Sequence, residues 1–427
     1  MTMTREKIKL RDYQQECVDK IIWDLTISGN SLCVIPTGGG KSIIVAETVQ
    51  TYGKPTLILQ PSKEILEQNY DKLLHYVDPS EIGVYSASMG RKDVNKYTFA
   101  TIQSIYKDPT FFSHFGLIII DESHLLNTKS ATGMLMEFIK DINQIRLSQN
   151  LPCLKIIGFT ATPYRMETMY IDWNTDDARI VTTIKLINRV KGFFWSRILY
   201  NMSMKDLIDR EYLCSLNYID ASVIEQKHLP LNASRSEFDM NAVDEFLENK
   251  RDRIIKAIKY GEETSSSVLV FCTSVKQAES LRADTPNSEV ITAKTKSKDR
   301  ERIIREFKNH TIKTVFNVGV LTIGFDHPSL DCIILLRPTR SIMLYIQMLG
   351  RGVRIAEGKT SCKVIDLTST VKNMGRVETF RLDKIDGKWD LISESGSWHA
   401  KELYSIHMGN DRITSGIDSN YTDTPPF

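Results

Sequence analysis

The sequence lacks the marks of several protein classes. Its seven cysteines form no C-x-x-C pair, which argues against a zinc ribbon or a disulfide framework and for reduced thiols. No apolar run approaches a membrane span, and Met1–Leu10 has no apolar segment of the signal-peptide kind. Basic residues exceed acidic ones by only 55 − 53 = 2, so any nucleic-acid-binding surface must be a local stripe. We therefore expect a cytoplasmic protein with no membrane partner.

The composition is that of an ordinary globular protein. Hydrophobic residues make up 41% and charged residues 25% of 427 residues, which excludes a wholly disordered or collagen-like chain. A chain of this length holds two domains, or three small ones, each with a sizeable core.

Short apolar runs alternate with amphipathic stretches in two successive sets. Short buried strands separated by helices favour a parallel sheet with crossover helices. The sequence therefore predicts an α/β fold of two tandem domains. The predicted strands lie at 34–35, 56–59, 97–100, 117–120 and 154–158, and then at 268–271, 290–291, 314–318, 332–336 and 362–367. The predicted helices lie at 42–52, 62–76, 242–259, 298–309 and 341–350.

The domain limits follow from this alternation. We expect a first domain over 1–205, a second over 206–372 and an accessory tail over 373–427, with a less regular stretch at 166–263. The tail carries six basic and nine acidic residues, a net charge of 6 − 9 = −3. Its Asp386-Gly387 pair, between two runs of strand character, predicts a β-hairpin.

Residues 31–42 have the order strand, glycine loop, helix. Three glycines let backbone N–H groups turn inward, and the following helix N-terminus favours a phosphate. Lys41 is then placed for the β and γ phosphates of ATP, and the Ser42 hydroxyl for Mg²⁺. The general pattern has glycine where this chain has Ile35, and the alternative is a flexible loop that contains Lys-Ser by chance.

Two carboxylates, Asp121 and Glu122, follow the apolar run 117–120. Ligands of parallel sheets bind at the carboxyl ends of the strands. Asp121 can hold Mg²⁺, and Glu122 can orient and deprotonate an attacking water. The alternative is a helix N-cap, where acidic residues are common.

The second half supplies two arginines three residues apart, Arg351 and Arg354. On a helix, that spacing puts both on one face. Arginine suits the charge that develops on a γ-phosphate during hydrolysis. The alternative is a solvated basic surface, although the absence of a second glycine-Lys-Ser loop favours the catalytic interpretation.

The order of these segments from Leu10 to about Asp366 resembles the superfamily 2 helicases of the DExH type. Singly, segments such as Thr-Ala-Thr at 160–162 mean little, but the whole set in this order is specific. The family also includes loops that lack the first glycine, which accounts for Ile35. The resemblance implies two RecA-like domains with an ATP cleft between them, and a motor that steps along a nucleic-acid strand.

The resemblance also assigns residues. The ATP-binding set is Arg11, Gln14, Thr37, Gly38, Gly39, Gly40, Lys41, Ser42, Asp121, Gly324 and Asp326, with Gln14 at the adenine and Ser42 and Asp121 as Mg²⁺ ligands. The catalytic set is Lys41, Glu122, Gln347, Arg351 and Arg354. The nucleic-acid-binding set is Pro61, Ser62, Thr101, Gln103, Ser104, Thr273 and Thr322, and the residues that couple the two activities are His124, Thr160 and Thr162.

Within the superfamily, the segments 320–326, 336–341 and 350–354 resemble the RadD-like group of bacterial and phage DNA-repair helicases. This implies ATP and Mg²⁺ as cofactors, DNA rather than RNA as partner, repair or replication proteins as further partners, a monomer, and a bacterial cytoplasm or nucleoid. The chain departs from the group because no cysteine-rich zinc segment follows the core.

Two other functions stay open at the level of sequence. One is an RNA helicase of the same core, because no motif reports on the 2′-hydroxyl. The other is a nucleotide-controlled DNA-binding or remodelling subunit that does not unwind. The aromatic residues are equally ambiguous: Phe193, Phe194 and Trp195 suit either a strand-separating wedge or core, and Trp389 and Trp398 suit either base stacking or hairpin packing.

Overall fold

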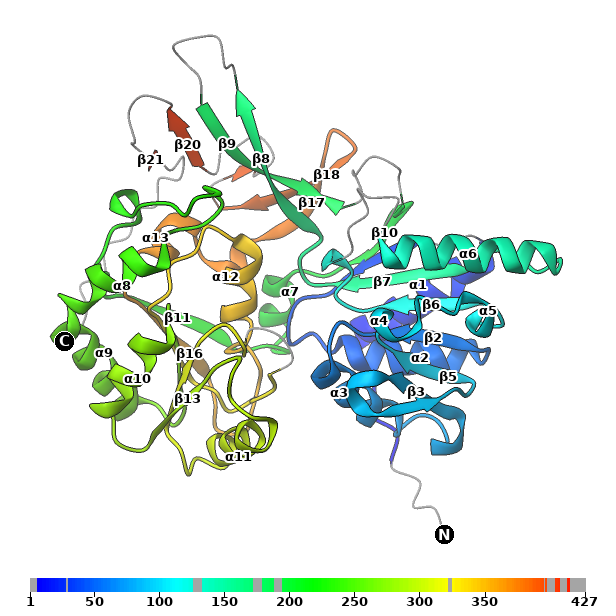
Figure 1. Cartoon of the computed structure of the whole chain (residues 1–427), viewed down its shortest axis with the longest axis horizontal. Coiled ribbons are helices and arrows are strands. Elements are labelled where there is room, and N and C mark those ends of the chain that lie inside the picture. The colour runs from blue at the N-terminus through cyan, green and yellow to red at the C-terminus, as the bar shows by residue number, and fades with distance from the viewer. Residues whose placement is uncertain are drawn as a thin grey trace. The chain divides into compact units, whose positions relative to one another are not determined.

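The computed structural model describes residues 6–27, 30–125, 133–171, 179–187, 194–321, 325–394, 396–397, 404–407 and 413–414. The chain divides into two compact units. Unit 1 comprises Met1–Arg165 and Lys185–Met202, and unit 2 comprises Met166–Ile184 and Ser203–Phe427. Each unit has its own sheet, so the predicted α/β class with tandem parallel sheets is confirmed (Figure 1).

The sheet of unit 1 has eight strands in the order β10-β1-β7-β6-β2-β5-β3-β4. All neighbours are parallel except β3 and β4. Every residue of Leu117–Ile120 is buried, as expected for a strand covered on both faces. The strands are β1 (Ser31–Val34), β2 (Thr56–Leu59), β3 (Ile82–Ser86), β4 (Arg91–Asp93), β5 (Tyr97–Ala100), β6 (Leu117–Ile120), β7 (Lys155–Thr160) and β10 (Arg197–Asn201).

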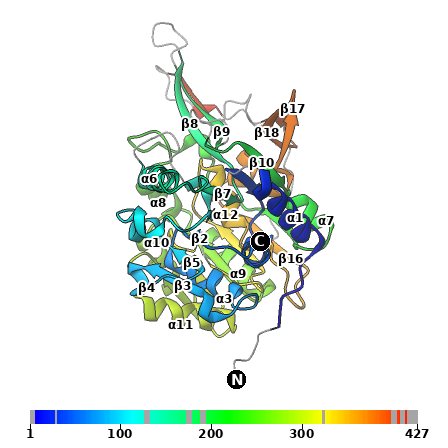
Figure 2. The same ribbon diagram turned by 90° about the vertical axis from the view of Figure 1, so that its right-hand side faces the viewer.

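Helices α1, α2 and α3 of unit 1 pack side by side, and α5 packs with α6. The α1 and α3 helices face the viewer in Figure 2. The helices are α1 (Asp12–Ile27), α2 (Lys41–Tyr52), α3 (Lys63–Leu73), α4 (Ile102–Ile105), α5 (Pro109–Phe112) and α6 (Met134–Ser148), with 3-10 turns η1 (Pro79–Glu81), η2 (Ala87–Met89) and η3 (Ser123–Leu125).

The main sheet of unit 2 has six strands, all parallel, in the order β11-β16-β15-β12-β14-β13. Its strands are β11 (Ser215–Asp220), β12 (Val268–Phe271), β13 (Ser288–Ile291), β14 (Thr314–Asn317), β15 (Cys332–Leu335) and β16 (Ser361–Asp366). Its helices are α7 (Met204–Asp209), α8 (Met240–Glu248), α9 (Arg251–Thr264), α10 (Val275–Ala283), α11 (Ser297–Lys308), α12 (Ile342–Leu349) and α13 (Thr370–Met374), with 3-10 turns η5 (Gln226–His228) and η6 (Val377–Thr379).

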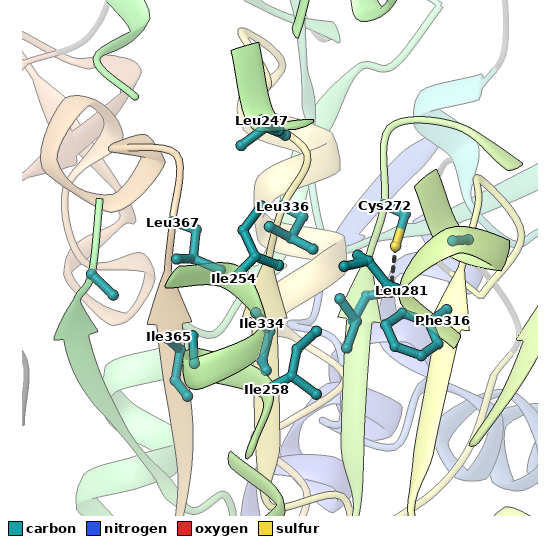
Figure 3. Close-up of a cluster of buried hydrophobic side chains, with 14 of the residues drawn as sticks. Leu247, Ile254, Ile258, Cys272, Leu281, Phe316, Ile334, Leu336, Ile365 and Leu367 are labelled. Atoms are coloured by element: carbon teal, nitrogen blue, oxygen red, sulfur yellow. Dashed lines mark hydrogen bonds between the residues drawn. The ribbon is translucent and has the colours of Figure 1, made fainter. Parts of the chain in front are cut away.

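One hydrophobic core of unit 2 lies between its sheet and helices α8 to α10. Ile254 and Ile258 of α9 point toward Ile334 of β15 and Ile365 of β16 (Figure 3). Alternate residues of the strands take part, because successive side chains of a strand point to opposite faces. This core fixes the sheet whose strand ends carry the candidate residues of unit 2.

The single helix predicted at 242–259 is wrong, because two helices occupy this stretch. The α8 helix ends at Glu248, and Asn249 turns its side-chain amide back to the Glu245 carbonyl oxygen (3.3 Å). Val243, Leu247, Ile254 and Ile258 enter the same core with the spacing of one continuous helix. The apolar period therefore concealed the break.

The stretch 166–263 contains more regular structure than we expected. It includes most of a long hairpin of β8 (Tyr164–Ile171) and β9 (Arg179–Leu186), which both views show as paired strands (Figures 1 and 2). Two strands of the tail, β20 (Tyr404–His407) and β21 (Ile413–Thr414), extend this sheet in the order β21-β20-β9-β8.

The hairpin predicted around Asp386-Gly387 is confirmed. The strands β17 (Arg381–Ile385) and β18 (Lys388–Ser393) pair antiparallel, with β19 (Gly396–Ser397) beside them. Asp386 and Gly387 have φ values of 50° and 74°, the backbone that a two-residue hairpin turn requires. Among the described residues, no helix is both long and apolar enough to cross a membrane.

Candidate functional site

The glycine loop of unit 1 connects the end of β1 to the start of α2. Gly38 and Gly40 have φ values of 82° and 75°, which side chains other than glycine rarely adopt. A Cβ atom at Gly40 would lie 2.4 Å from Gln14 Nε2, so the close approach also requires glycine there. No side chain caps the N-terminus of α2, which leaves its first amides available to an anion.

Gln14 lies against this loop. Its side chain is buried, and Nε2 donates to the carbonyl oxygen of Gly39 (3.4 Å), while Oε1 accepts from the Arg11 amide (2.9 Å). Tyr13, which sequence reasoning did not single out, donates its hydroxyl to the same Gly39 oxygen (2.8 Å). The start of α1 thus supports the loop from one side. Contact of Gln14 with adenine stays a prediction.

The two acidic residues follow β6 and face Lys41. Lys41 Nζ lies 3.7 Å from Glu122 Oε1, and Asp121 Oδ1 accepts from the Glu122 amide (2.9 Å). Burial, and then the neighbouring Glu122 charge, raises the pKa of Asp121 to about 6, against the opposing effect of Lys41. Glu122 has a φ of 46°, a left-handed conformation that costs about 1–2 kcal/mol outside glycine.

Asn69 is a member of this site that sequence reasoning missed. It is buried on α3, and its Nδ2 donates to Asp121 Oδ2 (3.1 Å). The contact joins residues 52 positions apart. The available signal was a polar side chain on the apolar face of a helix, between Leu66 and Leu73.

The predicted coupling residues lie together. His124 Nδ1 lies 2.8 Å from Thr160 Oγ1 and 3.4 Å from Glu122 Oε2, and Thr160 Oγ1 accepts from the Thr162 amide (3.0 Å). Burial lowers the pKa of His124, so the neutral imidazole is favoured. A polar chain therefore runs from the acidic pair to the end of β7. Its coupling role stays a prediction.

The predicted nucleic-acid contacts of unit 1 follow two adjacent strands, β2 and β5. Ser62 accepts from the Ile65 amide as the cap of α3 (3.4 Å), and Thr101 Oγ1 lies 2.9 Å from Ser104 Oγ. Pro61 is partly exposed and Gln103 is exposed. These residues lie at the carboxyl ends of their strands, and so does Asp121, whose amide donates to the Leu59 carbonyl oxygen at the end of β2 (3.1 Å).

In unit 2, the helix expected to carry both arginines ends too early. The α12 helix ends at Leu349, so Arg351 and Arg354 lie in the following loop and not on one helical face. Gly350 and Gly352 surround Arg351, and residues of low helix propensity end the helix there. The side chains converge in another way: Arg351 and Arg354 both donate to the Phe325 carbonyl oxygen, at 2.7 and 3.0 Å.

Arg354 also pairs with Asp326 at 3.1 Å, between Nη1 and Oδ1. Burial lowers the pKa of Arg354, and Asp326 partly offsets this effect. The Gln347 carbonyl oxygen accepts from Arg351 Nε (3.3 Å). Thr273 donates its hydroxyl to Asp244, whereas Thr322 and Gly324 lie outside the described residues.

The structure describes three of the five aromatic residues that the sequence analysis left open. Trp195 is almost fully buried and its ring covers Gly158, so it is core and not a wedge. Phe194 packs edge-on against it, with ring centroids 4.9 Å apart. Trp389 is partly buried in the tail hairpin, with Lys384 Nζ 5.2 Å from its ring centroid. Phe193 and Trp398 lie outside the described residues.

Comparison with known proteins gives two family matches. Residues 7–165 match the model described as "Type III restriction enzyme, res subunit". Residues 249–356 match the model described as "Helicase conserved C-terminal domain". The matches cover the glycine loop and acidic pair in unit 1 and the arginine loop in unit 2.

Individual relatives extend over most of the chain. IRC3 of Saccharomyces cerevisiae, whose name assigns it to the ATP-dependent helicases, is 27% identical over 84% of this chain. The chain spans 51% of IRC3, about half its length. The DNA 3'-5' translocase XPB2 of Sulfurisphaera tokodaii is 23% identical over 82% of this chain and 80% of its own length.

A solved structure shares the fold. A fragment assigned to the HsdR subunit of a type I restriction enzyme from Vibrio vulnificus superposes with a TM-score of 0.61 and 20% identity, over 91% of this chain and 71% of that chain. Similarity to helicases therefore extends over both units: residues 249–356 match a helicase family model, the relatives are named as helicases or translocases, and the solved structure shares the tandem RecA-like fold.

Proposed function

We propose that the protein is an ATP-dependent DNA helicase or translocase that couples ATP hydrolysis to stepping along a strand. The observation that carries this proposal is the position of Lys41. It follows the glycine loop at the N-terminus of α2, which no side chain caps, and its Nζ lies 3.7 Å from Glu122 Oε1, next in sequence to Asp121. This set of residues can bind a triphosphate, activate water and hold a metal. The names of the helicase and translocase relatives favour DNA.

In this mechanism, residues Thr37–Ser42 hold the phosphates, and Gln14 with Arg11 lies at the base. Glu122 accepts the proton of the attacking water, and its approach to Lys41 supports a place near the γ-phosphate. We assign Arg351, Arg354 and Gln347 to the γ-phosphate, and Gly324 and Asp326 to the binding of the nucleotide. His124, Thr160 and Thr162 pass the nucleotide state toward the nucleic-acid contacts.

The donor set fits Mg²⁺. Ser42 and Asp121 offer hydroxyl and carboxylate oxygens, the ligands that Mg²⁺ prefers. The buried Asp121 beside Glu122 is a place where a divalent cation relieves the repulsion between two carboxylates. The metal would neutralise charge on the phosphates, and Ser42 and Asp121 would hold it.

The finer assignments are part of the same proposal. Pro61, Ser62, Thr101, Gln103, Ser104, Thr273 and Thr322 contact the nucleic-acid backbone without reading sequence. We infer a RadD-like DExH subtype that works as a monomer with repair or replication proteins in a bacterial cell. The domain limits at 205 and 372, with 373–427 as an accessory tail, belong to this proposal.

The test is the rate of ATP hydrolysis by the full chain with Mg²⁺, first alone and then with single-stranded DNA, forked DNA or RNA of equal length. We expect stimulation by DNA and weaker stimulation by RNA. Lys41→Ala should abolish the rate, and Lys20→Ala, which removes an exposed ion pair on α1, is the matched control. Glu122→Gln should lower turnover about 10²–10⁴-fold while ATP stays bound.

Three outcomes contradict the proposal in different ways. Stimulation by RNA alone would mean that the protein acts on RNA and not on DNA. A hydrolysis rate that no nucleic acid changes would indicate a nucleotide-controlled module that a partner protein regulates. Normal hydrolysis by Glu122→Gln removes Glu122 from the role of general base.

A further inference from the structure

Lys359 lies outside every motif of the sequence analysis, yet it joins two loops of unit 2. Its ammonium donates to three backbone carbonyl oxygens: Pro328 (3.0 Å), Gly352 (2.7 Å) and Arg354 (2.7 Å). An ammonium group has three protons, so these contacts use its whole capacity. Pro328 belongs to the segment after Asp326, and Gly352 and Arg354 belong to the loop after α12.

The geometry of Lys359 is built by a turn of its own chain. The Lys359 amide donates to the Ala356 carbonyl oxygen (3.1 Å), and Gly358 has a φ of 75°. The turn directs the side chain back to the loop a few residues earlier. Within the described residues, no ion pair involves Lys359, so its charge is directed at carbonyl dipoles, which strengthens those hydrogen bonds.

Cys214 completes the support of the loop 352–354. Its amide donates to the Val353 carbonyl oxygen (2.8 Å), and its Sγ donates to the Gly352 oxygen (3.2 Å). With the two bonds from Lys359, every carbonyl oxygen of residues 352–354 has a donor. The backbone around Arg354 is therefore held on both sides, while its guanidinium rests on the Phe325 oxygen and Asp326.

We propose that Lys359 is a positioning residue for Arg354: it ties the loop 352–354 to the segment 325–328 and so presents the Arg354 guanidinium in one place. This inference rests on the proposed role of Arg354 at the γ-phosphate. A guanidinium displaced by about 1 Å can lose about 10²-fold in rate, so the two hydrogen bonds from Lys359 to the loop 352–354 have a direct kinetic consequence.

The test combines Lys359→Met with Arg354→Ala in a double-mutant cycle on the full chain. Methionine keeps the length of the side chain and removes its donors. We expect Lys359→Met to lower kcat about 10- to 100-fold, with KM for ATP changed little. In the Arg354→Ala background it should have almost no further effect, because the group that it positions is gone.

Lys363→Met is the matched control. Lys363 lies four residues later on β16, and its Nζ also donates to a backbone carbonyl oxygen, that of Thr264, away from the loop. Its variant should keep the kcat of the wild type. If Lys359→Met lowers kcat equally with and without Arg354, or leaves kcat unchanged, the positioning role is wrong.

Hydrogen exchange separates this inference from the proposed function. In the nucleotide-free protein, Lys359→Met should speed exchange in the peptide that contains residues 352–354, and Lys363→Met should not. If exchange speeds up but Arg354→Ala keeps full turnover, Lys359 does hold the loop 352–354, and the proposed role of Arg354 is wrong. If exchange is unchanged, Lys359 does not hold this loop, and the further inference is wrong. Should Lys359→Met fail to fold, Lys359→Gln, which keeps one amide donor group, takes its place.

Discussion

The two units present opposite chemistry around sheets of the same kind. In unit 1, side chains meet side chains: the Lys41 ammonium faces Glu122, and Glu122 faces the neutral imidazole of His124. In unit 2, Arg351 and Lys359 donate to backbone carbonyl oxygens, and Arg354 has one carboxylate partner, Asp326. Carbonyl dipoles fix a cation without neutralising it. The candidate residues of unit 1 are thus held by contacts between side chains, whereas the described contacts of the unit 2 loop are mostly to backbone oxygens.

The largest expected effect tests whether the positive charge of unit 2 does chemical work. Arg354→Ala should lower kcat by about 10³-fold or more, as for an arginine that stabilises the transferring phosphoryl group, with ATP binding largely kept. Steady-state hydrolysis and nucleotide binding measure the two quantities. Arg302→Ala, which removes a surface arginine of α11 that pairs with Glu289 and Glu306, is the control and should change neither.

If Arg354→Ala keeps its turnover, the comparison fails at its main point. The arginine loop would then be a structural brace of unit 2. A loss of ATP binding instead of turnover would place Arg354 in ground-state binding.

The second-largest effect is the pH dependence of stability that the buried His327 of unit 2 should cause. His327 is buried in unit 2, and its Nε2 lies 3.0 Å from Ser267 Oγ, which lies 3.0 Å from His310 Nδ1. Burial lowers the pKa of His327 to about 4, with smaller contributions from His310, Lys308 and Lys359 and an opposing one from Asp326. The folded state thus holds a neutral imidazole.

Because the unfolded chain binds this proton near its ordinary pKa of 6.5, stability is complete above pH 6.5 and is lost as the pH falls toward about 4. At 1.36 kcal/mol per pKa unit, the loss amounts to about 3 kcal/mol. Denaturant unfolding across this range, with His327→Gln as the comparison, measures it. In the variant, the free energy of unfolding should depend much less on pH. An unchanged pH dependence would mean that other groups cause it, among them His124 of unit 1, whose pKa burial also lowers.

The sequence predicts the features that depend on local pattern. It misses the contacts that loops make with residues far away in the sequence. The buried runs at 56–59, 97–100 and 117–120 became strands β2, β5 and β6, because short, mostly apolar runs between turns suit a sheet covered on both faces. The chain order of glycine loop and acidic pair also located the candidate site. These features are short in sequence and carry their own geometry.

Other features had no local signal. Asn69 reaches Asp121 over 52 positions, and Lys359 reaches Pro328 over 31. The arginine pair suited a helical face by spacing, but glycines ended α12 first, and the Phe325 oxygen gathered the two side chains instead. The hairpin of β8 and β9 was missed because its strands lie in a stretch without a strong apolar period.

The smallest effect compares how tightly the two units pack. A Cβ atom at Gly158 of β7 would lie 2.3 Å from the Trp195 ring, a rigid group that is itself almost fully buried. Gly158→Ala should therefore lower the free energy of unfolding of unit 1 by about 1–3 kcal/mol, the usual cost of an overpacked core. Denaturant unfolding followed by circular dichroism measures this free energy.

Gly261→Ala is the counterpart in unit 2. Gly261 lies on helix α9, and a Cβ atom there would lie 3.3 Å from Cys332 Sγ on β15, which is a tight contact. Its cost is offset by the gain of about 1 kcal/mol when alanine replaces glycine within a helix. We expect its free energy of unfolding to stay within about 1 kcal/mol of the wild type. Equal losses from both variants would show that the two cores are equally intolerant of an added methyl group, so that the units differ in their charged loops and not in their packing.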